Sequence, residues 1–295
     1  MKSTSIFSNP LLQLTISMFI FGTIGIFVRY IPFPSSVIAL ARGGIGMLFL
    51  LGIVFVSKKN LSKADIKRNL IPLCLSGTFI GFNWILLFEA YRYTTVATAT
   101  LCYYLAPVFV ILLSPIVLKD KLTVKKLLCV TTALVGMVFV SGVLETGIPS
   151  AGEAKGILFG VAAATLYASV ILCNKHIHDI GSYDMTIMQL GVATAVLFPY
   201  TLLTESIGSL EFSTSALLVL LFVASVHTGF AYALYFSSMQ GLSSDTIAIF
   251  SYIDPIIAII LSALLLHEPM GISGIIGAVL ILGSTFVCGL PEKDA

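Results

Sequence analysis

Long apolar runs separated by short polar breaks dominate this chain. Each run holds the roughly 17–25 residues that a helix needs to cross a bilayer. None alternates apolar and polar positions as a barrel strand does, and a backbone in lipid must satisfy its own hydrogen bonds, so the runs predict α-helices. The pattern predicts ten transmembrane helices, at residues 11–30, 35–56, 70–91, 95–117, 124–143, 155–175, 184–204, 214–238, 244–266 and 271–290.

One stretch of sequence occurs twice. Residues 82–118 align with residues 230–266 without a gap, and the alignment pairs Tyr104 with Tyr252 and Pro107 with Pro255. Five helices in each half is an odd number, so the second half must enter the membrane in the opposite sense. The expected architecture is an all-α membrane protein of two inverted five-helix repeats, which we place at 1–145 and 153–295. The alternative is chance similarity between two apolar segments.

The basic residues orient the helices. If the N-terminus is cytoplasmic, twelve of the sixteen lysines and arginines fall on the inner side, as the positive-inside rule requires. The loop at 119–126 carries four lysines, whereas its repeat mate at 267–274 carries none. Lysine is thus missing where inversion turns a loop outward. We expect a multi-pass protein of the cell (inner) membrane with both termini in the cytoplasm.

Composition excludes several functions. Charged residues make up only 10% of the chain, against about 25% in soluble domains, and the basic residues lie in loops, so nucleic acid is not an expected partner. The five cysteines lie within or at the ends of apolar runs without metal-ligand spacing, and no phosphate-binding or catalytic signature occurs. We therefore expect no enzyme activity, no cofactor and no metal. The oligomeric state, monomer or homodimer, stays open.

Asp254 and its neighbouring proline are the first candidates for a substrate site. A charge at mid-membrane costs at least about 2.5–3.5 kcal/mol on insertion scales, so it needs a reason. A proline donates no backbone hydrogen bond, so Pro255 frees the carbonyl of Ser251, and Pro107 frees the carbonyl of Tyr103. We expect two kinked helices that each offer a free acceptor and a tyrosine hydroxyl, Tyr104 in one and Tyr252 in the other. The alternative is that the kinks serve packing alone and that a neighbour caps Asp254.

Other polar side chains fall within the predicted helices. Arg42 cannot lose its charge, so it lines a substrate cavity and pairs with a substrate carboxylate or phosphate, forms an ion pair with Asp254, or extends to the lipid headgroups. Trp84 stacks on a cationic or aromatic ligand, or simply packs. His227 is a proton relay, a substrate ligand, or a histidine bonded to a neighbouring helix. The full candidate set for substrate binding is Arg42, Asn83, Trp84, Tyr104, Gln189, His227, Tyr252 and Asp254.

The twin segments at 90–128 and 237–283 resemble the EamA-type members of the drug/metabolite transporter superfamily. Members have prolines in the fourth and ninth helices and a glutamate after the ninth, which correspond here to Pro107, Pro255 and Glu268. The chain departs from the pattern in having Asp254 where the family often has a glutamate. The resemblance implies ten helices, a cavity between two halves, and export or exchange of small metabolites.

These observations lead us to expect a secondary transporter, more specifically an exporter, that works by alternating access around a central cavity. Amino acids and related compounds are the best match, because one cation, one carboxylate and several aromatics suit a zwitterion. Proton coupling is possible, with Asp254 as the carrier. The alternatives are an uncoupled facilitator, an importer of another small metabolite, or a membrane-embedded protein that transports nothing.

Overall fold

The computed structural model describes residues 9–58, 60–119, 121–146, 148–210, 213–239, 241–242, 244–268 and 270–290. Within these ranges all regular structure is helical. The first half holds α1 (Pro10–Arg29), α2 (Ser35–Val56), α3 (Lys63–Arg68), α4 (Leu70–Tyr93), α5 (Val96–Tyr103), α6 (Ala106–Val117), α7 (Val124–Val140) and α8 (Val143–Thr146). The second half holds α9 (Ala151–Asn174), α10 (Ser182–Thr204), η2 (Ile207–Ser209), α11 (Thr214–Phe222), η3 (Val223–Phe230), α12 (Ala231–Met239), α13 (Ser244–Ser251), α14 (Ile253–Leu265) and α15 (Ile272–Gly289).

Most of the predicted membrane helices are present. Among the described residues, eight helices are long and apolar enough to cross a membrane, counting Val96–Val117 and Thr214–Met239 as continuous spans. A shorter apolar helix occupies Ile249–Leu265, and the fifth predicted run forms α7, which is 17 residues long. The chain is a multi-pass helical membrane protein.

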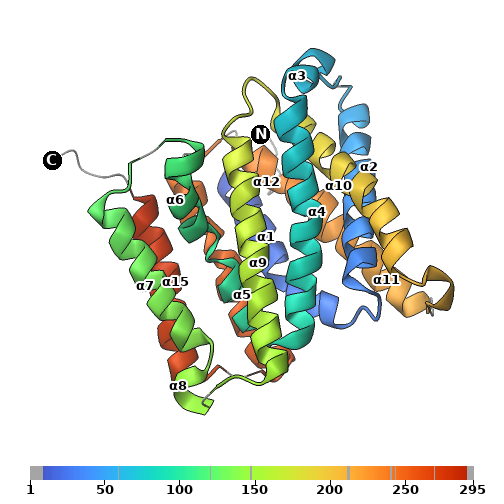
Figure 1. The fold of residues 1–295 in the computed structure, drawn as a ribbon. Helices are drawn as coiled ribbons and strands as arrows, with labels where there is room; N and C mark the ends of the chain where they lie inside the picture. Colours follow the sequence, from blue (N-terminus) through green and yellow to red (C-terminus); the bar gives the residue numbers. More distant parts are fainter. Residues whose placement is uncertain are drawn as a thin grey trace, which may run out of the picture.

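The helices pack in pairs that correspond between the two halves. Helix α4 packs on α9, and its counterpart α12 packs on α1, which is the counterpart of α9. In the same way α6 packs on α9, and its counterpart α14 packs on α1. Helix α2 packs on its counterpart α10, and α7 packs on α15. In Figure 1 the α7–α15 pair lies at one side of the bundle and α2, α10 and α11 lie at the other. Each half therefore contributes helices throughout the bundle, and the halves do not form separate lobes.

The loops divide between two ends of this bundle. Helices α3 and α8 lie at opposite ends in Figure 1. At the α3 end, Asn69 binds the backbone of His178, and Lys125 Nζ donates to the carbonyl of Leu290. The Glu145 carboxylate, from α8, accepts the amide of Ser273 in the first turn of α15. Helix α15 thus runs from the α8 end to the α3 end.

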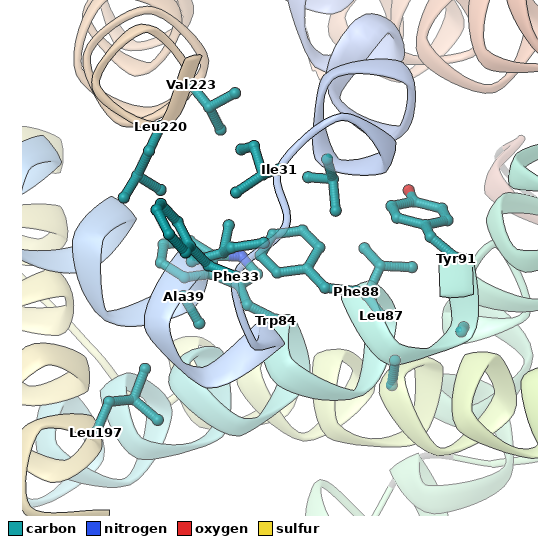
Figure 2. Packing of buried hydrophobic residues seen from close by; sticks show 14 of the residues in the cluster. Ile31, Phe33, Ala39, Trp84, Leu87, Phe88, Tyr91, Leu197, Leu220 and Val223 are labelled. Atoms are coloured by element: carbon teal, nitrogen blue, oxygen red, sulfur yellow. The ribbon is translucent and has the colours of Figure 1, made fainter. Parts of the chain in front are cut away.

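Close contacts between helices depend on glycine at two small-residue motifs of the sequence, Gly77-x-x-x-Gly81 and Gly156-x-x-x-Gly160. A Cβ at Gly77 would meet the backbone of α10 at 2.7 Å, and one at Gly160 would meet Cys102 of α5 at 2.7 Å. Both motifs therefore serve packing within the chain, as expected from small residues at helix crossings. Figure 2 shows part of the apolar core, in which Trp84 of α4 lies near Phe33 and Ala39.

The two prolines interrupt their helices more strongly than expected. The sequence predicts a kink in one continuous helix, but α5 ends at Tyr103 and α6 begins at Ala106, and α13 ends at Ser251 before α14 begins at Ile253. The prolines lie in the first turn of α6 and of α14, where a missing amide costs nothing. Each helix is therefore interrupted just before its proline, so the membrane-spanning part of the chain contains two helix breaks.

Candidate functional site

The break before α14 is bridged by a tyrosine from the other half. The Tyr104 hydroxyl lies 3.3 Å from the carbonyl oxygen of Ser251 and 3.1 Å from Oδ2 of Asp254. The Ser251 carbonyl is the acceptor that Pro255 was predicted to free. Tyr104 and Asp254 therefore meet, and they join the two halves at the break between α13 and α14.

Tyrosines surround the Asp254 carboxylate. It interacts electrostatically with the hydroxyls of Tyr91, Tyr103, Tyr104 and Tyr167. The rings of Tyr103 and Tyr167 lie 5.2 Å apart between centroids, yet 39% of the Tyr167 surface remains accessible. No described lysine or arginine lies within ion-pair distance of Asp254. Asp254 is thus a half-buried carboxylate that is bonded to one described hydroxyl, that of Tyr104, rather than to a cation.

Arg42 shares two of these tyrosines, Tyr91 and Tyr103, with Asp254. It interacts electrostatically with the hydroxyls of Tyr91, Tyr103 and Tyr232, and Tyr91 is influenced by Asp254 as well. Its side chain is 4% exposed. The Arg42 Nε donates to Thr228 Oγ1 at 3.0 Å. No described carboxylate pairs with it, so neither an ion pair with Asp254 nor an extension to the headgroups describes this arginine.

The Arg42 guanidinium rests on aromatic faces. Its central carbon lies 4.2 Å from the Trp84 ring centroid and 5.3 Å from that of Phe88. Trp84 was expected to stack on a cationic ligand or to pack, and the cation that it meets belongs to the chain itself. A cation–π contact of this kind is worth about 2 kcal/mol or more when it is desolvated.

His227 lies next to Thr228 in η3, a π-helical segment of the span Thr214–Met239. Its Nε2 lies 2.9 Å from Thr23 Oγ1, and that hydroxyl donates its proton to the carbonyl of Ile20. Thr23 therefore accepts from Nε2–H, which leaves Nδ1 of the neutral ring unprotonated. The buried Nδ1 has no hydrogen-bond partner. His227 is bonded to a neighbouring helix, one of the three roles expected of it.

Three other candidates lie in contacts between helices. Asn83 donates to the carbonyl of Ala163 at 2.6 Å and receives a long contact, 3.4 Å, from the Tyr103 hydroxyl. Gln189 donates to Ser76 and Asn174, on α4 and α9. The Tyr252 hydroxyl bonds Thr285 on α15 at 3.0 Å. Asn83 thus reaches the tyrosines, whereas Gln189 and Tyr252 are bonded away from Arg42 and Asp254.

A second polar cluster connects the two halves at the α8 end of the bundle. Arg29 Nη2 pairs with Glu268 Oε1 at 2.5 Å and donates to the carbonyl of Thr94 at 2.8 Å. The other Glu268 oxygen accepts the amide of Val96 at 3.0 Å and the hydroxyl of Ser262 at 2.7 Å. We call these residues the latch. The repeat mate of Glu268, Asp120, lies outside the described residues.

We call the residues around the two charges the central cluster: Arg42, Trp84, Thr228, Asp254, Tyr91, Tyr103, Tyr104 and Tyr167. Several of its members were not predicted from the sequence. Tyr91, Tyr103 and Tyr167 were not singled out, because a tyrosine in an apolar run does not reveal the direction in which it faces. Thr228 was missed because its role depends on the π-helix, which shifts the register of its side chains. A signal did exist for Tyr103, since its carbonyl was predicted to be freed by Pro107.

Comparisons with known proteins agree with this architecture. The family model described as the EamA-like transporter family matches twice, at residues 9–142 and 154–290. The chain is 30% identical over 272 residues to the uncharacterized transporter YxxF of Bacillus subtilis (strain 168), which covers 90% of this chain and 86% of that protein. It is 26% identical to an uncharacterized transporter of Archaeoglobus fulgidus, over 93% of this chain and 94% of the relative.

More distant matches cover the chain as well. Protein PecM of Dickeya dadantii (strain 3937) is 24% identical over 80% of this chain and 78% of its own length. A crystal structure with 17% sequence identity superposes with a TM-score of 0.64 and covers 95% of this chain and 96% of the other; it supports the fold alone. The two matches of the family model together span most of the sequence, and the chain belongs to the EamA-like transporter family.

Proposed function

We propose that the protein is a secondary transporter of the cell membrane that exports small metabolites, with amino acids and related compounds as the first candidates. The observation that carries this proposal is the contact between Tyr104 of one half and the broken helix around Asp254 of the other. Broken helices that meet between two repeats are a common setting for substrate and coupling-ion sites in secondary transporters.

The transport mechanism that we propose needs ten membrane helices in two inverted repeats, 1–145 and 153–295. Three observations support this arrangement: the family model matches each half, the packing pairs correspond between the halves, and Ile249–Leu265 and α7 occupy the predicted ninth and fifth positions. The two loops related by the repeat also lie apart. Lys125 reaches Leu290 at one end of α15, whereas Gly271 precedes its other end, about 27 Å away along an 18-residue helix.

The positive-inside rule supports placing the α3 end in the cytoplasm, which makes both termini cytoplasmic. Residues 1–8 and 291–295 lie outside the described ranges. In this orientation the latch of Arg29 and Glu268 lies at the outer end, so the structure represents a state closed to the outside. Transport then requires the latch to separate while contacts at the inner end form.

In the proposed cycle, α4–α6 and α11–α14 rock against the remaining helices, and the central cluster faces each side in turn. Asp254 is the candidate proton carrier, because a carboxylate without a cation partner gains little from staying charged in the membrane. Tyr104 holds the carboxylate while the helices move. A zwitterion with an apolar side chain fits this cluster, since Arg42 and Asp254 supply opposite charges and tyrosines lie between them.

The proposal is tested by efflux in cells and in proteoliposomes. Overproduction is expected to raise tolerance to toxic amino-acid analogues, and an imposed proton gradient is expected to drive the corresponding amino acid across the membrane in the direction opposite to the protons. Flux that is unaffected when the gradient is collapsed favours an uncoupled facilitator. Failure of a broad panel of amino acids, amines, sugars and nucleosides to move in either direction contradicts transport.

A further inference from the structure

We propose that Arg42 binds a carboxylate of the transported compound through its two terminal nitrogens, with Thr228 as the residue that positions the guanidinium. This inference rests on the proposed transport function and assigns the chemical group that the Arg42 side of the site takes.

The Arg42 guanidinium has one edge without a partner among the described residues. It is a planar fork with five N–H donors. One face lies over Trp84, and Nε is engaged by Thr228, which leaves the edge formed by the two Nη nitrogens. Among the described residues no hydrogen bond engages either Nη atom. This edge matches a carboxylate, whose two oxygens accept two parallel hydrogen bonds.

The charge balance selects a carboxylate over a phosphate. Arg42 is buried, its nearest rings are uncharged, and no described acid pairs with it. One negative charge compensates one arginine. A phosphate with two negative charges would leave an excess charge in the bilayer, close to tyrosines that also feel the charge of Asp254. The same reasoning disfavours a neutral ligand, because it would leave the arginine uncompensated.

Thr228 acts on the ligand only through Arg42. Its hydroxyl is fully buried, and its methyl group is so close to α2 that a Cβ at Gly46 would meet it at 2.5 Å. It therefore holds the Arg42 side chain at Nε and fixes the orientation of the guanidinium. Loss of the hydroxyl is expected to reorient the guanidinium without removing its charge.

The chain contains its own reporter for this site. Trp84 is the single tryptophan of the sequence, and it stacks against the guanidinium. The test measures Trp84 emission of the full chain in lipid nanodiscs during titration with two matched sets of ligands: leucine, 4-methylpentanoate and leucinol, and phenylalanine, 3-phenylpropanoate and phenylalaninol. Each set pairs two carboxylates with an amino alcohol that lacks one.

In at least one set, we expect both carboxylates to change Trp84 emission saturably. The amino alcohol of that set is expected to leave the emission unchanged. Arg42→Gln is expected to weaken carboxylate binding at least roughly tenfold, as loss of a charged hydrogen-bonding partner does. Thr228→Val is expected to weaken it about fivefold, with Thr228→Ser restoring most of the affinity. Gel filtration and thermal unfolding of each variant verify that it is folded.

Two outcomes overturn the carboxylate site: the amino alcohols change Trp84 emission with the same affinity as the carboxylates, or no carboxylate produces a saturable change. Flux in proteoliposomes is measured separately. Saturable binding without flux keeps the carboxylate site and rejects transport. Flux of an amino acid with an unchanged KM in Arg42→Gln keeps transport and rejects the site.

Discussion

Tyr104 and Tyr252 occupy equivalent positions before equivalent prolines, but their hydroxyls point to different partners. Tyr104 crosses to the other half and bonds Ser251 and Asp254 at the break before α14. Tyr252 stays within its own half, where it bonds Thr285 and packs edge-on against Phe286. The backbone break is repeated, whereas the chemistry is concentrated at one of the two breaks.

The difference shows how a repeat can supply symmetric motion and an asymmetric site. In the proposed mechanism each half bends at its break, but the position equivalent to Asp254 is Ala106, so only one break carries a charge. The opposite charge, Arg42, comes from the other half, and the glutamine loosely aligned with it, Gln189, is bonded to α4 and α9. A compound in this site would thus contact two differently charged walls.

The largest effect is expected for Asp254→Asn. This change removes the only charge at the second break and with it the proposed proton carrier. Flux is expected to fall by a factor on the order of 10–100 and to lose its response to a proton gradient. Glu89→Gln is the matched control, because Glu89 pairs with Arg92 at 3.2 Å outside the central cluster. An unchanged pH dependence of transport in Asp254→Asn would rule out the carrier role.

The two tyrosines provide the next test. Tyr104→Phe removes contacts to both Ser251 and Asp254, so flux is expected to fall roughly tenfold. Tyr252→Phe loses a bond that does not reach the site, so flux is expected to change less than about twofold, while the free energy of unfolding falls by about 1 kcal/mol. Initial rates in proteoliposomes and chemical denaturation measure the two effects. Equal losses of flux would mean that the breaks are functionally equivalent.

The two proline substitutions are expected to differ less in their effect on the transport rate. Pro255→Ala restores an amide that can donate to the Ser251 carbonyl, so it competes with the Tyr104 hydroxyl and stiffens the charged break. We expect a reduction in transport rate of a few fold, on the scale of one hydrogen bond. Pro107→Ala is expected to have a smaller effect, because no described side chain of the other half is bonded to the Tyr103 carbonyl that Pro107 frees, whereas Tyr104 is bonded to the Ser251 carbonyl that Pro255 frees. A larger loss in Pro107→Ala would reverse the comparison.

Sequence reasoning located the breaks, the freed carbonyl of Ser251 and the two buried charges, because proline and intramembrane charge are costly wherever they occur. It did not predict that the cation above Trp84 is Arg42, since two residues 42 positions apart meet only through the crossing of α2 and α4. The pair of Glu89 and Arg92 is local in one helix, so its three-residue spacing can be read from the sequence. The tyrosines around Asp254 were not predictable, because hydropathy does not record which face of a helix is internal.

The central claim is that the outer end opens once in every transport cycle. The most direct measurement places cysteines at Arg29 and Glu268, in a chain whose five native cysteines are replaced, and joins them with a bifunctional methanethiosulfonate reagent. The account predicts that the cross-link stops flux in proteoliposomes and that a reductant restores it, while either single cysteine has no such effect. Undiminished flux through the fully cross-linked protein would contradict alternating access between these two halves.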